Sequence, residues 1–160
     1  MSNSIAVPGL NISSSVKNDT SIKLLVFEIG KLALALPILQ VQKVVRQNEV
    51  HGSGLSHVNL THLPEREIAV VDLHQKLFGV SLTQSATTGY FIISRQVASE
   101  PIGIVVAQAP SLIDVPLKQI RLLPDTYRRA DTLAIASHVT VIPKEDGNTT
   151  LFILDLTCLI

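Results

Sequence analysis

Residues 23–46 constrain the fold more than any other stretch, because they read as two paired strands joined by a glycine turn. Lys23–Ile29 is rich in branched and aromatic side chains, which favour strands. Gly30 can adopt the positive φ that a tight hairpin needs. Leu32–Leu36 then alternates leucine with alanine, so one face of the second strand carries three leucines. Pro37 has no N–H to give to a ladder, so we expect the strand to end there.

Beyond the proline, apolar side chains recur at three- and four-residue spacing, at Ile38, Val41, Val44 and Val45. This period predicts a short helical turn. Residues 47–61 are polar and glycine-rich, which predicts a loop.

Short apolar runs continue about every ten residues along the rest of the chain, bounded by turn residues. The runs predicted as further strands are Ile68–Val71, Gly89–Ser94, Pro101–Val106, Leu133–Ala136, Val139–Ile142 and Thr150–Leu154. Asp72 and Asp155 each follow one of these runs and are expected to cap a short helical turn, with Gly79 ending the first. Asp146–Gly147 predicts a hairpin turn. Because helices this short cannot cover a parallel sheet, the pattern favours antiparallel barrels over a doubly wound fold.

The length of 160 residues suits one domain, or two small halves that share a core. Residues 1–21 are rich in Ser and Asn and predict a flexible tail. Val80–Thr88 is a Ser/Thr/Gln-rich stretch and predicts the join between the halves. We therefore expect a first barrel at about residues 22–82 and a second at about 88–160, and leave open an exchange of strands between them.

Composition argues against two classes of partner. Thirteen basic and thirteen acidic residues balance along the chain, aromatic residues make up 4%, and Trp is absent, which disfavours nucleic-acid binding. The longest apolar run, Leu32–Leu39, is far shorter than the roughly 20 residues of a membrane-spanning helix. No N-terminal segment reads as a secretory signal, so we expect a cytoplasmic protein with no direct membrane insertion.

No constellation of residues predicts catalysis, a metal or a cofactor. Zinc needs three or four converging ligands, whereas His57 and His62 lie in the predicted loop with no cysteine or third ligand nearby. No nucleophile elbow, phosphate-binding glycine loop or dinucleotide fingerprint occurs. A small β-barrel metal protein or hydrolase using these histidines and acidic loop residues remains an alternative.

Four segments resemble, in order, the conserved pattern of the CheW-like domain. They are Phe27–Ile38 with Val41–Arg46, Ile68–Leu73 with Leu77–Gly79, Ile102–Val106, and Ile153–Leu156. The resemblance implies an all-β fold of two intertwined five-stranded SH3-like or OB-like barrels with short helices. It also implies a non-catalytic adaptor that couples the cytoplasmic tip of a methyl-accepting chemoreceptor-like protein to the regulatory domain of a CheA-type histidine kinase. Such systems control chemotaxis, phototaxis or twitching.

Two departures from the family pattern bear on partner choice. The family usually has a Glu two residues after the position of Val41, and here that residue is Lys43. The family also carries an Asn-x-Arg-Gly stretch before its central strand, whereas residues 59–67 contain no Gly, and Arg66 matches the arginine only if the loop shifts. A reversed charge at an interface tends to change the partner. A divergent regulator that competes with or sequesters array components is therefore the alternative.

These features select the candidate protein-binding residues. They are Ile38, Val41, Lys43, Val44, Glu65 and Arg66. The apolar members are expected to form the centre of a docking patch, although helical spacing of apolar residues is equally typical of core packing. The charged members are expected to set partner choice, although most surface charges are only solvated.

Overall fold

The chain folds into short strands connected by turns and single-turn helices. The computed structural model describes residues 20–46, 50–51, 58–62, 66–79, 89–95, 100–128 and 134–159. Its strands are β1 (Ser21–Ile29), β2 (Leu32–Pro37), β3 (Val41–Arg46), β4 (Val50–His51), β5 (Val58–His62), β6 (Glu67–Val71), β7 (Tyr90–Ser94), β8 (Ile102–Val106), β9 (Ser111–Pro116), β10 (Arg121–Leu122), β11 (Ala136–Lys144) and β12 (Gly147–Leu154). The helical elements are the 3₁₀ turns η1 (Ile38–Gln40), η2 (Leu117–Gln119) and η3 (Leu156–Cys158), and the helices α1 (Leu73–Phe78) and α2 (Asp125–Arg128).

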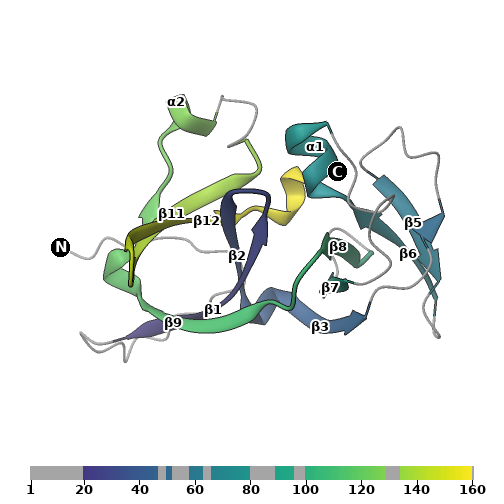
Figure 1. Ribbon diagram of the computed structural model, residues 1–160, viewed down its shortest axis with the longest axis horizontal. Coiled ribbons are helices and arrows are strands. Elements are labelled where there is room, and N and C mark those ends of the chain that lie inside the picture. Colours follow the sequence, from purple (N-terminus) through teal and green to yellow (C-terminus); the bar gives the residue numbers. More distant parts are fainter. Residues whose placement is uncertain are drawn as a thin grey trace.

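The strands form two six-stranded sheets, which lie on the left and the right of Figure 1. Sheet A has the order β10-β11-β12-β2-β1-β9, and sheet B has the order β3-β7-β8-β6-β5-β4. Each sheet contains one parallel pair, β12 with β2 and β6 with β8. The prediction of a mostly β fold with two strand assemblies and short helices is confirmed. The two-residue strands β10 and β4 at the sheet edges bring each assembly from the expected five strands to six.

The β1–β2 hairpin belongs to the same sheet as β9–β12, whereas β7–β8 belongs with β3–β6. Sheet B is therefore built from one continuous stretch, residues 41–106, and sheet A from the segments on both sides of it. The chain crosses from one sheet to the other at η1 and again between β8 and β9. The expected barrel boundaries, at residues 22–82 and 88–160, remain predictions.

The described residues form three apolar clusters. The largest lies between the two sheets and takes buried residues from both, among them Phe27, Leu34 and Leu36 from sheet A and Ile92 and Ile104 from sheet B. We call it the shared core. Two smaller clusters belong to one sheet each, around Ile22, Leu24 and Ile153 in sheet A and around Val70, Phe91 and Val105 in sheet B.

Alternation along β2 sends neighbouring side chains into different clusters. Leu34 and Leu36 are buried in the shared core, with Leu32 packed against it, while Ala35 is buried in the cluster of sheet A. The predicted face of three leucines is confirmed. Strands with both faces buried read as nearly continuous apolar runs, which explains the composition of β2 and of β8.

Both predicted aspartate caps form. The Asp72 carboxylate accepts a hydrogen bond from the Gln75 N–H at 3.1 Å, and Gly79 ends α1 in the left-handed conformation with φ of 77°. The Asp155 carboxylate accepts one from the Thr157 N–H, also at 3.1 Å. The Asp-Leu repeat in the sequence therefore encodes the same local structure at the end of β6 and of β12.

The predicted hairpin turns also form. Gly30 turns β1 into β2 with φ of 60°. In the last hairpin Lys144 pairs with Gly147, so Glu145 and Asp146 make the turn, one residue earlier than the predicted Asp146–Gly147.

The prediction of a helical turn beyond Pro37 is wrong for most of its length. Only Ile38–Gln40 is helical, and Val41–Arg46 is the edge strand β3. The pairing of β3 with β7 shifts register between Val41 and Lys43. A bulge inserts one extra residue, so Val41 and Val44 share a face at a spacing that imitates a helix.

The prediction of a loop over residues 47–61 is also wrong in part, because β4 and the polar strand β5 begin within it. The two strands predicted at Leu133–Ala136 and Val139–Ile142 are a single strand, β11, which starts at Ala136, and Leu133 lies outside the described residues. Of the tail predicted over residues 1–21, residues 1–19 lie outside them, and its last residue, Ser21, belongs to β1. The predicted linker Val80–Thr88 also lies outside the described residues.

Gly30→Ala and Gly79→Ala separate backbone strain from crowding. Both glycines have positive φ, but a Cβ at Gly30 would lie 2.9 Å from Phe78 Cε2, whereas one at Gly79 would meet nothing within 4 Å. We expect Gly79→Ala to lower the free energy of unfolding by about 1 kcal/mol through the backbone alone, and Gly30→Ala to lower it by more. Chemical denaturation measures both. In a Phe78→Ala background the two glycine substitutions should cost the same, and a persisting difference would contradict the contact.

Candidate functional site

The apolar candidates from the sequence fall into different environments. Val41 is buried in the shared core, and Ile38 is half-buried against it. Val44, on the edge strand β3, is 38% exposed. The exposed apolar residue between Ile38 and Val41 is Leu39, which is 51% exposed and was not among the predicted residues. The docking patch expected at Ile38, Val41 and Val44 stays a prediction, and the apolar side chains exposed along this stretch are Leu39 and Val44.

The exposure of Leu39 follows from the 3₁₀ turn η1. With three residues per turn, a side chain and its neighbour point in directions about 120° apart, so Ile38 faces the core while Leu39 faces solvent. Arg95, just after β7, fixes this turn: its Nε donates to the Leu39 carbonyl and its backbone N–H to the Gln40 carbonyl, at 2.7 and 2.8 Å. The Leu39 side chain therefore projects into solvent from a turn whose backbone is held in place by Arg95.

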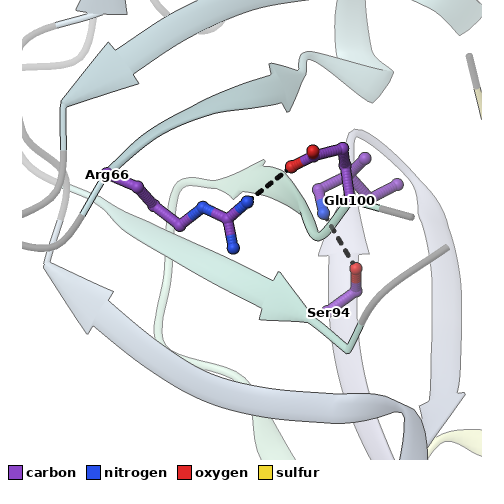
Figure 2. A network of polar contacts seen from close by, with 4 residues as sticks. Arg66, Ser94 and Glu100 are labelled. Atoms are coloured by element: carbon purple, nitrogen blue, oxygen red, sulfur yellow. Dashed lines mark hydrogen bonds and ion pairs between the residues drawn. The ribbon is translucent and has the colours of Figure 1, made fainter.

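Arg66 forms an ion pair that the sequence did not indicate. Its guanidinium Nη2 lies 2.6 Å from Glu100 Oε2, as Figure 2 shows, and the two side chains are 44% and 67% exposed. Arg66 directly precedes β6 and Glu100 lies two residues before β8. Because β6 and β8 are parallel, both residues lie at the same end of sheet B. Glu65, the other predicted residue here, is outside the described residues.

Ser94 joins the end of β7 to the start of β8, close to this ion pair. Its hydroxyl accepts a hydrogen bond from the Ile102 N–H at 3.0 Å and donates one to the Arg95 carbonyl at 2.7 Å. Figure 2 shows Ser94 and Glu100 on neighbouring strand ends. The starts of β3, β6 and β8 and the end of β7 thus lie at one edge.

We name this edge, with Leu39, Arg66, Arg95 and Glu100, the sheet-B edge surface. It combines an exposed apolar side chain with two cations and one anion. Protein interfaces have this composition, with an apolar anchor that loses water on binding and a polar rim that sets orientation. The sheet-B edge surface is therefore the candidate protein-binding site.

Lys43 occupies a different environment from that expected of a surface charge. It is half-buried on β3 and pairs in register with Ile93, which belongs to the apolar cluster of sheet B. Directly opposed residues of an antiparallel pair share a face. The charge that departs from the family pattern therefore lies on the face of β3 shared with that cluster.

The chemistry of the described residues offers no centre for a metal ion. Within them, no group of three or more His, Cys, Asp and Glu side chains is placed to hold one. His57 lies outside the described residues, as does the side chain of His62. Ser137 Oγ lies 2.8 Å from His138 Nδ1, but both residues are buried, so a substrate has no access to the pair. Along this part of the chain, no helix has both the length and the apolar character to cross a membrane.

Comparison with known proteins shows the family and the fold to which this architecture corresponds. The family model described as the CheW-like domain matches residues 23–160. The crystal structure of the scaffolding protein TtCheW from Thermoanaerobacter tengcongensis is similar, with a TM-score of 0.68 and 18% sequence identity, over 92% of this chain and 91% of that one. No curated protein matches the chain. The structural likeness supports the two-subdomain β-barrel fold that the sequence predicted.

Val41→Ala and Leu39→Ala test the division between core and surface. We expect Val41→Ala to lower the free energy of unfolding by about 2 kcal/mol, because it removes buried methyl groups from the shared core. Leu39→Ala should change it by less than about 0.5 kcal/mol, because that side chain is already largely in water. Urea denaturation of the two variants measures both values. Equal losses would contradict the different placement of the two residues.

Proposed function

We propose that this chain, which belongs to the CheW-like domain family, is an adaptor that couples a chemoreceptor-type sensor to a CheA-type histidine kinase. The family consists of non-catalytic scaffolds of chemotaxis signalling. The observation that carries the proposal is the family match along residues 23–160. The resulting signal would control motility through chemotaxis, phototaxis or twitching.

The sheet-B edge surface supplies one docking face for such an adaptor. Leu39 provides the apolar anchor, and Val44 extends the apolar area along the edge strand β3. Arg66 and Arg95 are the residue type that interfaces favour, because a guanidinium stacks and forms hydrogen bonds in a fixed plane. A protein partner that offers an apolar pocket rimmed by carboxylates fits this arrangement.

An adaptor that joins two proteins needs a second face. Sheet A exposes large apolar side chains at its own edges, Leu112 on β9 and Leu122 on β10, and Tyr127 is exposed on the adjoining helix α2. Leu112 and Leu122 lie on opposite edge strands of sheet A, and neither belongs to the sheet-B edge surface. A second protein that docks at either edge would therefore contact residues other than Leu39.

Leu39→Ser tests the first face. We expect this variant to bind the cognate partner at least about tenfold more weakly, as for an interface anchor. The purified partners to use are the kinase regulatory domain and the receptor tip from the same genome, with affinities from biolayer interferometry. Val141→Ser is the matched control, because Val141 is equally exposed, at 51%, but lies on β11 of sheet A. Equal losses in both variants, or no binding of either partner by the unaltered protein at micromolar concentration, would refute the proposal.

The second candidate function is a divergent regulator that competes with or sequesters array components. Lys43 favours it, because a cation on β3 replaces the acid of the family pattern. Such a protein would bind one component of the array and exclude the usual adaptor. Its partner would then be set by the changed charge.

Lys43→Glu distinguishes the two functions. If the reversed charge redirects the protein, we expect Lys43→Glu to gain binding to a general kinase–receptor array, and Lys43→Gln to show a smaller gain because it only removes the charge. Co-sedimentation with reconstituted arrays measures the gain. Thermal denaturation serves as the control for folding, since Lys43 is half-buried. Unchanged co-sedimentation of both folded variants would rule out the regulator.

A further inference from the structure

We propose that Glu100 masks Arg66, so that a partner must bring its own carboxylate to displace Glu100 from the sheet-B edge surface. The inference rests on the proposed function, because it assigns a specificity role within that docking face. Glu100 then acts as an internal competitor for the site on Arg66. Acidic partners that bind strongly are accepted and weaker ones are excluded.

The geometry of the pair leaves most of the guanidinium available. The contact joins one Nη atom to one carboxylate oxygen, at 2.6 Å. An arginine side chain has five N–H donors and commonly binds a carboxylate through two parallel hydrogen bonds. Within the described part of the chain, this is the only side-chain polar contact of either residue. A partner carboxylate that binds in the two-bond mode would therefore form a better pair than Glu100 does.

The pair is also exposed enough to exchange. With side chains 44% and 67% exposed, both charges keep much of their hydration, and ion pairs of this kind are weak. Replacing Glu100 by an external carboxylate leaves no buried charge unpaired. Glu100 and a partner's carboxylate therefore compete reversibly for Arg66.

The fold does not depend on this ion pair for its register. The parallel ladder of β6 and β8 begins at Ala69 with Ile102, beyond both charged residues, and Glu100 adds one isolated backbone bridge that a change of its side chain leaves in place. Side chains of the two strands are buried in the shared core and in the cluster of sheet B. The Arg66–Glu100 ion pair therefore adds little to the stability of β6 and β8, because buried apolar side chains already hold these strands together.

Glu100 also decides the charge of the surface. With it, the sheet-B edge surface has two cations and one anion, and without it only Arg66 and Arg95 remain charged. Arg95 is held in place, since its Nε already donates to the Leu39 carbonyl. Neutralising Glu100 therefore leaves two cations on the sheet-B edge surface, of which Arg95 is held against Leu39, and this suits an acidic protein surface.

A second exposed ion pair gives a matched control. Lys23 Nζ lies 3.2 Å from Asp114 Oδ1 in sheet A, and the side chains are 50% and 61% exposed. Removing the acid of this pair changes the net charge of the protein by the same amount as removing Glu100. It does so on β9 of sheet A, outside the sheet-B edge surface, so it is a control for the partner whose binding Leu39→Ser weakens.

The test compares Glu100→Gln, Asp114→Asn, Arg66→Gln and the Arg66→Gln/Glu100→Gln double variant. Each is titrated as the full chain against the kinase regulatory domain and the receptor tip, at low and high ionic strength. We expect Glu100→Gln to bind the partner whose affinity Leu39→Ser weakens about two- to fivefold more tightly, which corresponds to the free energy of an exposed ion pair. For that same partner, Arg66→Gln should weaken binding and abolish the gain in the double variant, and Asp114→Asn should match the unaltered protein. The gain should shrink at high salt, which screens exposed charges.

Three results would overturn the inference. Equal or weaker binding by Glu100→Gln, while the unaltered protein binds, would show that the pair is structural and would leave the proposed function standing. An equal gain in Asp114→Asn would assign the effect to net charge. Absence of binding to both partners by the unaltered protein and by every variant would refute the proposed function, and the masking with it.

Discussion

The shared core between the two sheets is the constraint on which the rest of the structure depends. It receives side chains from both central hairpins, β1–β2 and β7–β8. It also receives side chains from β12, which is parallel to β2, and from β6, which is parallel to β8. The opposite faces of these hairpins pack into the clusters of their own sheets. Space on those faces is limited: a Cβ at Gly103 would lie 3.3 Å from Ile68 Cδ1, and Ala35 fills the corresponding place beside Ile153 in sheet A. Small residues there let the parallel strand pack closely against the hairpin.

This burial decides where a partner can bind. A strand with two buried faces has no face left for docking, so apolar side chains can be presented only by strands with an open face, connecting segments and short helices. Among the described residues, every exposed large apolar side chain avoids β1, β2, β6, β7, β8 and β12. Leu39 is in the segment that crosses between the sheets, and Leu112 and Leu122 are on edge strands. The position of the surface proposed for recognition thus follows from which segments the core leaves exposed.

The sequence was most informative where structure is local. Gly30 and the two capping aspartates could be predicted because a turn or a cap involves only a few consecutive residues. β3 was mistaken for a helix because its bulge depends on pairing with β7, which is distant in sequence. Which side chain of the turn after Pro37 faces solvent depends on packing against both sheets, so Leu39 was missed. Arg66 and Glu100 are 34 residues apart, and only the parallel pairing of β6 with β8 brings them together.

Charge in this protein acts over short distances. Its formal net charge is zero, so it has no monopole to steer a partner from afar. At physiological ionic strength the Debye length is about 8 Å, which limits the influence of an exposed charge to its own neighbourhood. In the proposed function, discrimination between partners would then arise from contacts such as the one between Arg66 and Glu100, where a change of one residue alters the charge that a partner meets. Selection by an internal carboxylate suits a neutral adaptor, because it sets specificity without changing the field of the whole molecule.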